Sequence, residues 1–72
     1  MFALISQNGM LYTGRAGEGW LSRDKAEAFL YSTEGEAIRK AASFNRNFDL
    51  HGEMFQAVEE DDILTFFEKV VY

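Results

Sequence analysis

The sequence contains no cysteine and no proline. Without cysteine there can be no disulfide framework, thiolate zinc site or cysteine nucleophile, so the covalent bridges common in small secreted domains are excluded. Long hydrophobic runs are also lacking, since no apolar stretch approaches the length needed to span a bilayer. Residues 1–9 have neither the basic start nor the long apolar stretch of a secretory signal. We therefore expect a cytoplasmic protein with no membrane partner.

The residue combinations that most catalytic sites need are scarce. His51 is the only histidine and has no second imidazole, cysteine or serine at a suggestive spacing, which is typical of a helix end or a loop. Residues 22–25 match the Ser-x-x-Lys pattern of penicillin-recognising enzymes, but the chain lacks the partner motifs that those enzymes need. The glycine-rich segment 14–19 lacks the Lys-Ser/Thr of a phosphate-binding loop. We expect no enzyme and no cofactor, because an enzyme would have to use His51 with carboxylates in a pocket that so short a chain can scarcely build.

Apolar and aromatic side chains are abundant instead. Hydrophobic residues make up 47% of the 72 residues and aromatic ones 15%, namely seven Phe, three Tyr and one Trp. A disordered chain does not carry so many apolar groups, and the length suits one domain. We therefore expect residues 1–72 to fold as a single domain.

The first half of the chain predicts a hairpin followed by irregular structure. Asn8-Gly9 lies between two apolar runs, 2–5 and 10–12, which indicates a tight hairpin with a type I′ turn. Three glycines in residues 14–19 predict a flexible loop. Residues 22–31 are ambiguous; we favour one turn of helix, capped by Ser22, followed by a strand.

The best defined element is a helix over about 33–48. Thr33 and Glu36 form a Thr-x-x-Glu capping box at its start. Its apolar stripe consists of Ala37, Ala41, Phe44 and Phe48, with Ile38 beside it. Residues 49–52 should end this helix, and 54–58 should form a further strand. We predict an α+β fold, in which an antiparallel sheet packs against this main helix.

The last residues, 63–72, have an amphipathic pattern that favours a C-terminal helix over about 62–71. A strand is the alternative, because the final Val-Val-Tyr is β-prone.

Negative charge is concentrated in the last third of the chain. Residues 1–46 carry five acids and six bases, a net +1, whereas residues 47–72 carry seven acids and one lysine, a net −6. The acidic run consists of Glu59, Glu60, Asp61 and Asp62. One interpretation is that Asp61 or Asp62 caps the last helix; the other is an acidic contact surface for a basic partner protein. A metal site is not expected, because consecutive carboxylates diverge and no calcium-loop spacing is present.

Two large side chains on or beside the glycine loop are further binding candidates. Arg15 and Trp20 are of types enriched at interface hot spots, although Trp20 as a core residue is the alternative. Direct nucleic-acid binding is not expected, because acids nearly cancel the bases of the first two-thirds. Eleven aromatic residues are many for so small a core, which leaves a structural homo-oligomer as a second class of function.

The segment from Trp20 to Asn45 contains an aromatic residue, then Asp24-Lys25-Ala26, then Ala28-Phe29, then Ser32 to Ala37 leading into an alanine-rich helix. This pattern, about a third of the chain, resembles short accessory proteins of bacteriophages. The resemblance implies an acidic binding module that modulates a larger host protein in the bacterial cytoplasm, such as RNA polymerase, and it implies no site residues. The alternative function is inhibition of a host nuclease or CRISPR effector by nucleic-acid mimicry.

Overall fold

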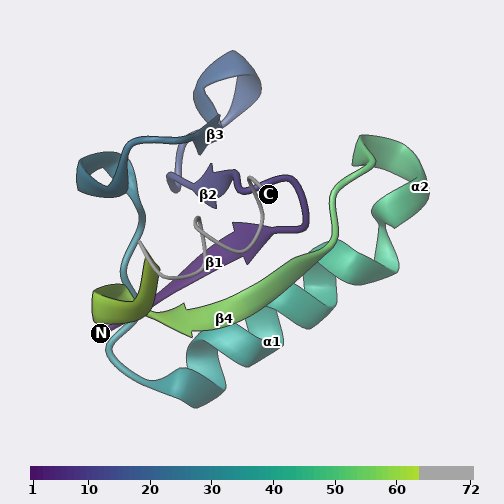
Figure 1. Ribbon diagram of the computed structural model, residues 1–72. Coiled ribbons are helices and arrows are strands. Elements are labelled where there is room, and N and C mark those ends of the chain that lie inside the picture. Colours follow the sequence, from purple (N-terminus) through teal and green to yellow (C-terminus); the bar gives the residue numbers. More distant parts are fainter. Residues whose placement is uncertain (64–72) are drawn as a thin grey trace.

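A four-stranded antiparallel sheet forms the centre of the computed structural model, which describes residues 1–63 (Figure 1). Its strands are β1 (Phe2–Ser6), β2 (Leu11–Tyr12), β3 (Leu21–Ser22) and β4 (Phe55–Glu59), in the order β3-β2-β1-β4. β1 pairs with β2 on one side and along its whole length with β4 on the other. The predicted antiparallel α+β fold is confirmed.

β1 is central because its side chains are apolar on both faces. Ala3, Leu4 and Ile5 are fully buried. Neighbouring residues of a strand point to opposite faces, so Leu4 packs on the helix side while Ala3 and Ile5 pack with Leu11 and Ile63 on the other. A continuous apolar run is what a strand covered on both faces requires.

The main helix, α1 (Glu34–Arg46), lies across one face of the sheet (Figure 1). The Thr33 hydroxyl accepts a hydrogen bond from the Glu36 N–H at 3.3 Å and donates to a Glu36 carboxylate oxygen at 3.0 Å. The predicted N-cap at Thr33 is therefore confirmed, whereas the Glu36 carboxylate accepts the Ser32 and Thr33 hydroxyls in place of the Thr33 N–H of a full capping box. The small side chains of Ala37 and Ala41 are buried and let the helix approach the strands closely.

The far end of this helix differs from the prediction. α1 ends at Arg46, and a second short helix, α2 (Phe48–His51), follows and ends at Gly52, whose φ is +74°. Because the chain changes direction at Asn47, Phe48 leaves the predicted stripe and is 39% exposed. Ile38, placed beside the stripe, is 52% exposed.

The predicted type I′ turn is wrong, although the hairpin is present. Asn8 has a negative φ, and only Gly9, at +78°, adopts the left-handed region there. The Gly9 N–H donates to the Ser6 carbonyl and the Ser6 N–H to the Met10 carbonyl, the bonding of a three-residue loop with a glycine bulge. The buried Ser6 hydroxyl favours this loop, because it accepts hydrogen bonds from the Asn8 and Met10 N–H groups.

The segment before α1 also differs in detail. Two 3₁₀ turns, η1 (Gly17–Gly19) and η2 (Lys25–Glu27), replace the flexible loop and the single helical turn. Asp24, rather than Ser22, caps η2, because its carboxylate accepts the Ala26 N–H at 2.9 Å. The strand predicted after this turn is absent, since no strand lies between η2 and α1.

A single bridge takes the place of that strand. The N–H groups of Phe2 and Tyr31 each donate to the other residue's carbonyl. β1 extends beyond the end of β2, so Tyr31 occupies the position beside Phe2 that β2 leaves open.

The predicted C-terminal helix, about 62–71, lies mostly outside the described residues. After β4 the structure shows a 3₁₀ turn, η3 (Glu60–Asp62), and a fully buried Ile63. No helix within residues 1–63 is long and apolar enough to cross a membrane.

Candidate binding site

Aromatic rings gather where the glycine loop, α1, α2 and β4 meet. The Trp20 ring centroid lies 5.7 Å from that of Phe44, 5.4 Å from that of His51 and 5.9 Å from that of Phe55. Tyr12 adds an edge contact with Phe44 at 4.9 Å. Edge and tilted contacts of this kind are favourable between aromatic rings, so the cluster holds each ring in a defined orientation.

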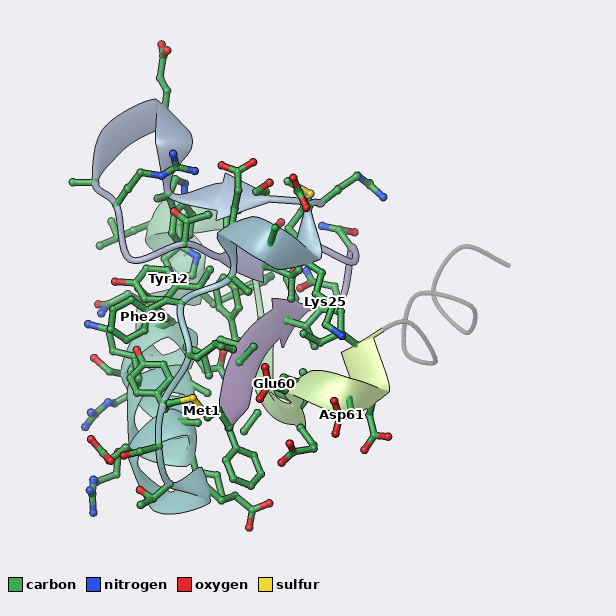
Figure 2. The ribbon with its side chains drawn as sticks, turned by 90° about the vertical axis from the view of Figure 1, so that its left-hand side faces the viewer. Met1, Tyr12, Lys25, Phe29, Glu60 and Asp61 are labelled. Atoms are coloured by element: carbon green, nitrogen blue, oxygen red, sulfur yellow. The ribbon has the colours of Figure 1, made fainter. Side chains whose placement is uncertain are left out.

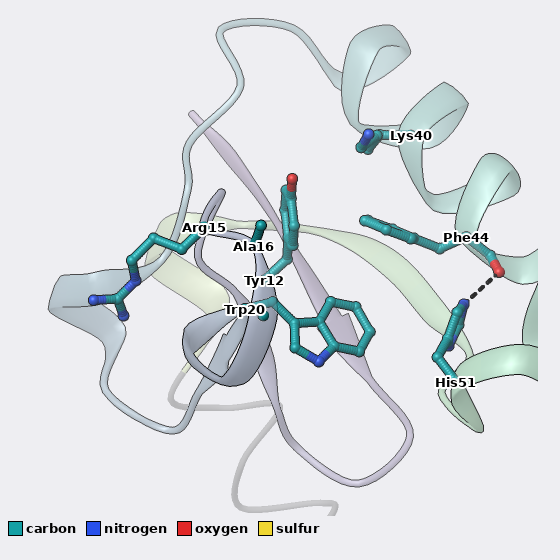
Figure 3. A pocket seen from close by; sticks show the side chains of 8 residues that line it. Tyr12, Arg15, Ala16, Trp20, Lys40, Phe44 and His51 are labelled. Atoms are coloured by element: carbon teal, nitrogen blue, oxygen red, sulfur yellow. Dashed lines mark hydrogen bonds between the residues drawn. The ribbon is translucent and has the colours of Figure 1, made fainter.

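Four of these rings form the walls of an open pocket of about 450 Å³ (Figure 3). We call it the aromatic pocket. It is lined by Tyr12, Arg15, Ala16, Gly17, Trp20, Lys40, Phe44 and His51. Two of the predicted site residues, Arg15 and Trp20, therefore belong to one site. Trp20 is half-buried and also packs against the core cluster under α1, so the core interpretation holds in part, and its binding role stays a prediction.

Backbone and hydroxyl contacts close the glycine loop and so position Trp20. The Thr13 N–H donates to the Trp20 carbonyl at 2.9 Å, and the Thr13 hydroxyl donates to the Gly19 carbonyl at 2.6 Å. Gly14 and Gly17 have φ values of +80° and +74°, which side-chain-bearing residues rarely adopt. Gly14 and Gly17 thus shape a loop that these hydrogen bonds close.

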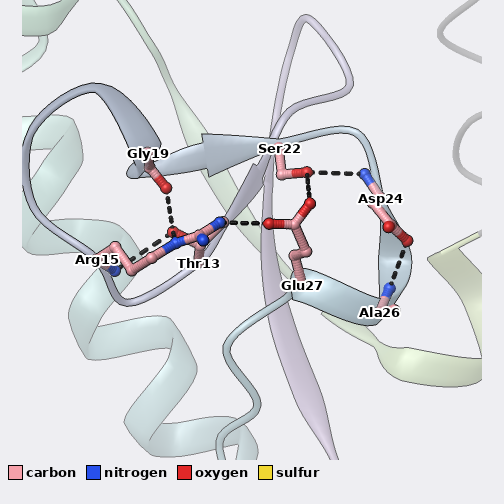
Figure 4. A network of polar contacts seen from close by, with 7 residues as sticks. All are labelled: Thr13, Arg15, Gly19, Ser22, Asp24, Ala26 and Glu27. Carbon is pink, nitrogen blue, oxygen red and sulfur yellow. Dashed lines mark hydrogen bonds and ion pairs between the residues drawn. The ribbon is translucent and has the colours of Figure 1, made fainter.

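Arg15 is held beside the pocket by a polar network (Figure 4). Its guanidinium forms an ion pair with Glu27, and the other Glu27 carboxylate oxygen accepts the Ser22 hydroxyl at 3.1 Å. The Arg15 guanidinium, and secondly the Ser22 hydroxyl, hold the pKa of Glu27 below its ordinary value. The charge of Arg15 is therefore largely balanced within the chain.

His51 serves as a wall whose two ring nitrogens are engaged by the backbone. Nε2 lies 2.8 Å from the Phe44 carbonyl (Figure 3). Nδ1 lies 3.1 Å from the Glu53 nitrogen, whose N–H it accepts. These contacts fit a neutral imidazole with its hydrogen on Nε2. Both ring nitrogens are therefore already engaged by the backbone.

Lys40 supplies a positive charge at the rim. Its ammonium lies 5.0 Å from the ring centroid of Phe44 and 5.9 Å from that of Tyr12, within the range of cation–π attraction. Lys40 also lines a neighbouring depression of about 360 Å³ along α1. That depression is lined by Tyr31, Glu36, Arg39, Lys40 and Ser43.

The acidic run lies elsewhere, at the end of β4 next to the N-terminus (Figure 2). The Met1 ammonium lies 3.2 Å from Glu59 and 3.3 Å from Glu60. Hydrogen bonding to Glu59 first, and to Glu60 next, raises the pKa of this amine. Asp61 and Asp62 are exposed, and neither forms an ion pair within residues 1–63.

The predicted site residues thus fall into two separate regions. Glu59 is paired with Phe2 at one end of the β1–β4 ladder, whereas Phe55, which contacts Trp20, is paired with Ser6 at the other. Arg15 and Trp20 therefore do not share a surface with the acidic run.

Besides Ala16 and Gly17 of the glycine loop, the sequence did not identify four lining residues with large side chains: Tyr12, Lys40, Phe44 and His51. Phe44 was assigned to the core stripe, and the i, i+4 spacing of Lys40 and Phe44 was the signal that they share a helix face. Nothing in the sequence placed His51 beside Trp20, because α2 brings them together only in the folded chain.

No group of three or more acidic or histidine side chains in residues 1–63 is arranged to hold a metal ion. The chain matches no protein-family model, and its comparison with curated proteins and with solved structures gives no match.

Proposed function

We propose that this chain is a non-enzymatic protein-binding module and that the aromatic pocket is its contact site on a larger protein. One observation carries the proposal: an open pocket whose walls are the rings of Tyr12, Trp20, Phe44 and His51. Tyrosine and tryptophan in desolvated pockets are the residues that most often dominate binding energy.

The packing of the rings favours binding. Trp20 contacts three other rings, so its orientation is set before a partner arrives. Association then costs less side-chain entropy than it would at a surface of mobile side chains. The use of both His51 nitrogens in backbone contacts supports a binding role over a catalytic one, since a general base needs a free nitrogen.

The acidic run belongs to the same proposal as a steering element. Asp61 and Asp62 are exposed at the far end of β4 and would attract a basic surface at long range. The double substitution Asp61→Lys with Asp62→Lys should slow association with the partner protein about tenfold at low salt and much less at high salt. Circular dichroism should be unchanged. Unchanged association at every salt concentration would limit these residues to solubility and helix capping.

The target class of the proposal comes from the resemblance to bacteriophage accessory proteins. We propose that the chain regulates a host machine, with RNA polymerase the first candidate. Binding of the labelled chain to purified bacterial RNA polymerase, followed by transcription in vitro, tests this form directly. If neither binding nor an effect on transcription occurs, this target is wrong, whereas the binding role is judged by the cross-linking experiment below.

Site-specific photo-cross-linking tests the pocket. A benzoyl-phenylalanine at Ala16, on the pocket rim, should give a discrete protein adduct in a bacterial lysate. The same group at Ala42, on the exposed side of α1, should not. Trp20→Ala should remove the Ala16 adduct, while Ile38→Ala, which shortens an exposed apolar residue outside the pocket, should not. Equal adducts from both positions, or none from Ala16, would contradict the proposal.

A second candidate, a structural homo-oligomer, is favoured by a different observation. Three apolar side chains around the α2–β4 connection are exposed: Phe48, Leu50 (84%) and Met54. Exposed apolar groups of this kind are typical of association surfaces. Sedimentation velocity at micromolar concentration should show a dimer or larger species that Leu50→Ser weakens. A monomer would exclude this function.

A further inference from the structure

We propose that the aromatic pocket accepts an acidic peptide segment, with one aromatic side chain inserted between the rings and a neighbouring carboxylate next to Lys40. This inference rests on the proposed function and gives its partner a chemistry. It is opposite in sign to the basic partner surface that the acidic run would attract, so it concerns a different contact of the same partner.

The first argument is the charge of the pocket. The chain carries 12 acids and 7 bases, yet no carboxylate is among the residues that line the pocket in the described part of the chain. Its charged lining groups are Arg15 and Lys40. Because Glu27 largely balances Arg15, the net charge of the pocket comes from Lys40, and a positive pocket on a protein of net charge −5 favours an anionic ligand.

The second argument is the difference between the two cations. Glu27 forms an ion pair with Arg15. No carboxylate of residues 1–63 lies within 4 Å of the Lys40 ammonium, whose neighbours are the ring faces of Phe44 and Tyr12. Lys40 is therefore the group that can receive a carboxylate from a ligand without breaking an internal ion pair.

The third argument is shape. A volume of about 450 Å³ is within the range of small-ligand sites and leaves room for a large side chain, and the surrounding rings favour an aromatic one through edge contacts. The neighbouring depression continues the surface along α1 and contributes Arg39 and Ser43, with Lys40 shared between the two. A peptide lying across both would carry its acidic residue beside its aromatic residue, at the shared lysine.

A peptide fits these observations better than a single-stranded nucleic acid, which also combines planar groups with negative charge. Nucleic-acid binding requires several cations along a phosphate backbone. Here Glu36 lies in the depression beside Arg39 and Lys40. A long polyanion would also be repelled by the net charge of the chain.

The experiment uses the full chain and three acetylated, amidated peptides: Glu-Phe-Glu, Gln-Phe-Gln and Lys-Phe-Lys. Trp20 is the only tryptophan and lines the pocket, so its fluorescence reports occupancy, and amide NMR shifts locate the site. We expect the acidic peptide to bind about threefold or more tightly than the neutral one, as a partly exposed ion pair allows, and the basic peptide to bind most weakly.

Two charge-matched variants separate Lys40 from general electrostatics. Lys40→Gln should abolish the preference for the acidic peptide over the neutral one. Lys25→Gln, which removes the same charge from the exposed η2 turn outside the pocket, should retain it. The comparison of the three peptides on the unmodified chain needs no variant, so it tests the preference for an acidic peptide even if Lys40→Gln perturbs the fold.

Several results would overturn the inference. These are equal binding of all three peptides, tightest binding of the basic peptide, no binding up to about 10 mM, shifts outside the pocket, an equal effect of the two variants, or tighter binding of a thymidine oligonucleotide than of the acidic peptide. A specific cross-link from Ala16 alongside any of these would leave the protein-binding role standing and remove only the acidic-peptide assignment. Loss of that cross-link would remove the binding role itself.

Discussion

Replacement of Asn45 by alanine should destabilise the fold far more than its place in the last turn of a helix suggests. Asn45 projects from α1 to the outer edge of β4, where its side-chain amide donates to the Phe55 carbonyl at 3.0 Å and its oxygen accepts the Phe55 N–H at 2.7 Å. β4 is an edge strand, and Phe55 is a residue whose backbone groups point away from β1, because its neighbour Met54 bonds to Gln7. One side chain thus takes the place of a further strand.

The magnitude follows from these two bonds. Each contributes about 1 kcal/mol net, and a partly buried backbone group left without a partner adds to the cost. Alanine has a higher helix propensity than asparagine, which offsets about 0.6 kcal/mol of this loss in the free energy of unfolding. We therefore expect Asn45→Ala to lower the free energy of unfolding by about 2 kcal/mol. The control is Asn47→Ala, which removes one exposed bond to the Ser43 carbonyl and should cost about 0.5 kcal/mol.

Urea unfolding, followed by circular dichroism and by Trp20 fluorescence, measures the difference. With a denaturant dependence of about 1 kcal/mol per molar urea for so small a domain, the midpoint should fall by about 2 M for Asn45→Ala and about 0.5 M for Asn47→Ala. Equal midpoints for the two variants would refute the reasoning, because they would show that water replaces the Asn45 amide at β4 without cost.

Two further predictions concern the glycine loop and its network. Because the pKa of Glu27 is lower in the folded chain than in the unfolded chain, its pairing with Arg15 stabilises the fold above the ordinary carboxyl pKa of about 4.5 and ceases to do so as the pH falls through the folded value. The gap between the urea midpoints of wild type and Glu27→Gln should therefore be widest near neutral pH and close as the pH falls below the ordinary carboxyl pKa of about 4.5 and through the folded value; a constant gap would contradict this. Gly14→Ala should cost about 2–4 kcal/mol, because its Cβ combines a positive φ with a collision against the Phe29 ring, whereas Gly17→Ala has only the positive φ and should cost about 1 kcal/mol. Equal midpoints for the two alanine variants would show that the Phe29 ring moves aside freely.

Local patterns in the sequence predicted the elements whose cause is local. The Thr33–Glu36 cap is satisfied by groups within one helical turn, so it was readable from four residues. The apolar run of β1 and Gly9 in the hairpin loop were likewise visible, and with the capped helix they indicated an antiparallel α+β fold.

Turn type and helix length needed the tertiary structure. Asn8-Gly9 is compatible with two hairpin turns, and the buried Ser6 hydroxyl, which bonds to Asn8 and Met10, favours the bulged one. Similarly, the apolar stripe continues to Phe48 in the sequence, but α1 ends at Arg46, and Gly52 closes a second helix that turns away from the stripe.

The candidate site depended on the fold most of all. Arg15 and Trp20 were visible as residue types, but the pocket exists because α2 places His51 against Trp20 and because α1 brings Phe44 beside Tyr12. These contacts join residues 31 or 32 positions apart in the chain. Their geometry is set by the packing of helices on a sheet, which no short-range pattern encodes. The sequence by itself determined the inventory of rings and charges; only the tertiary structure decided which of them meet.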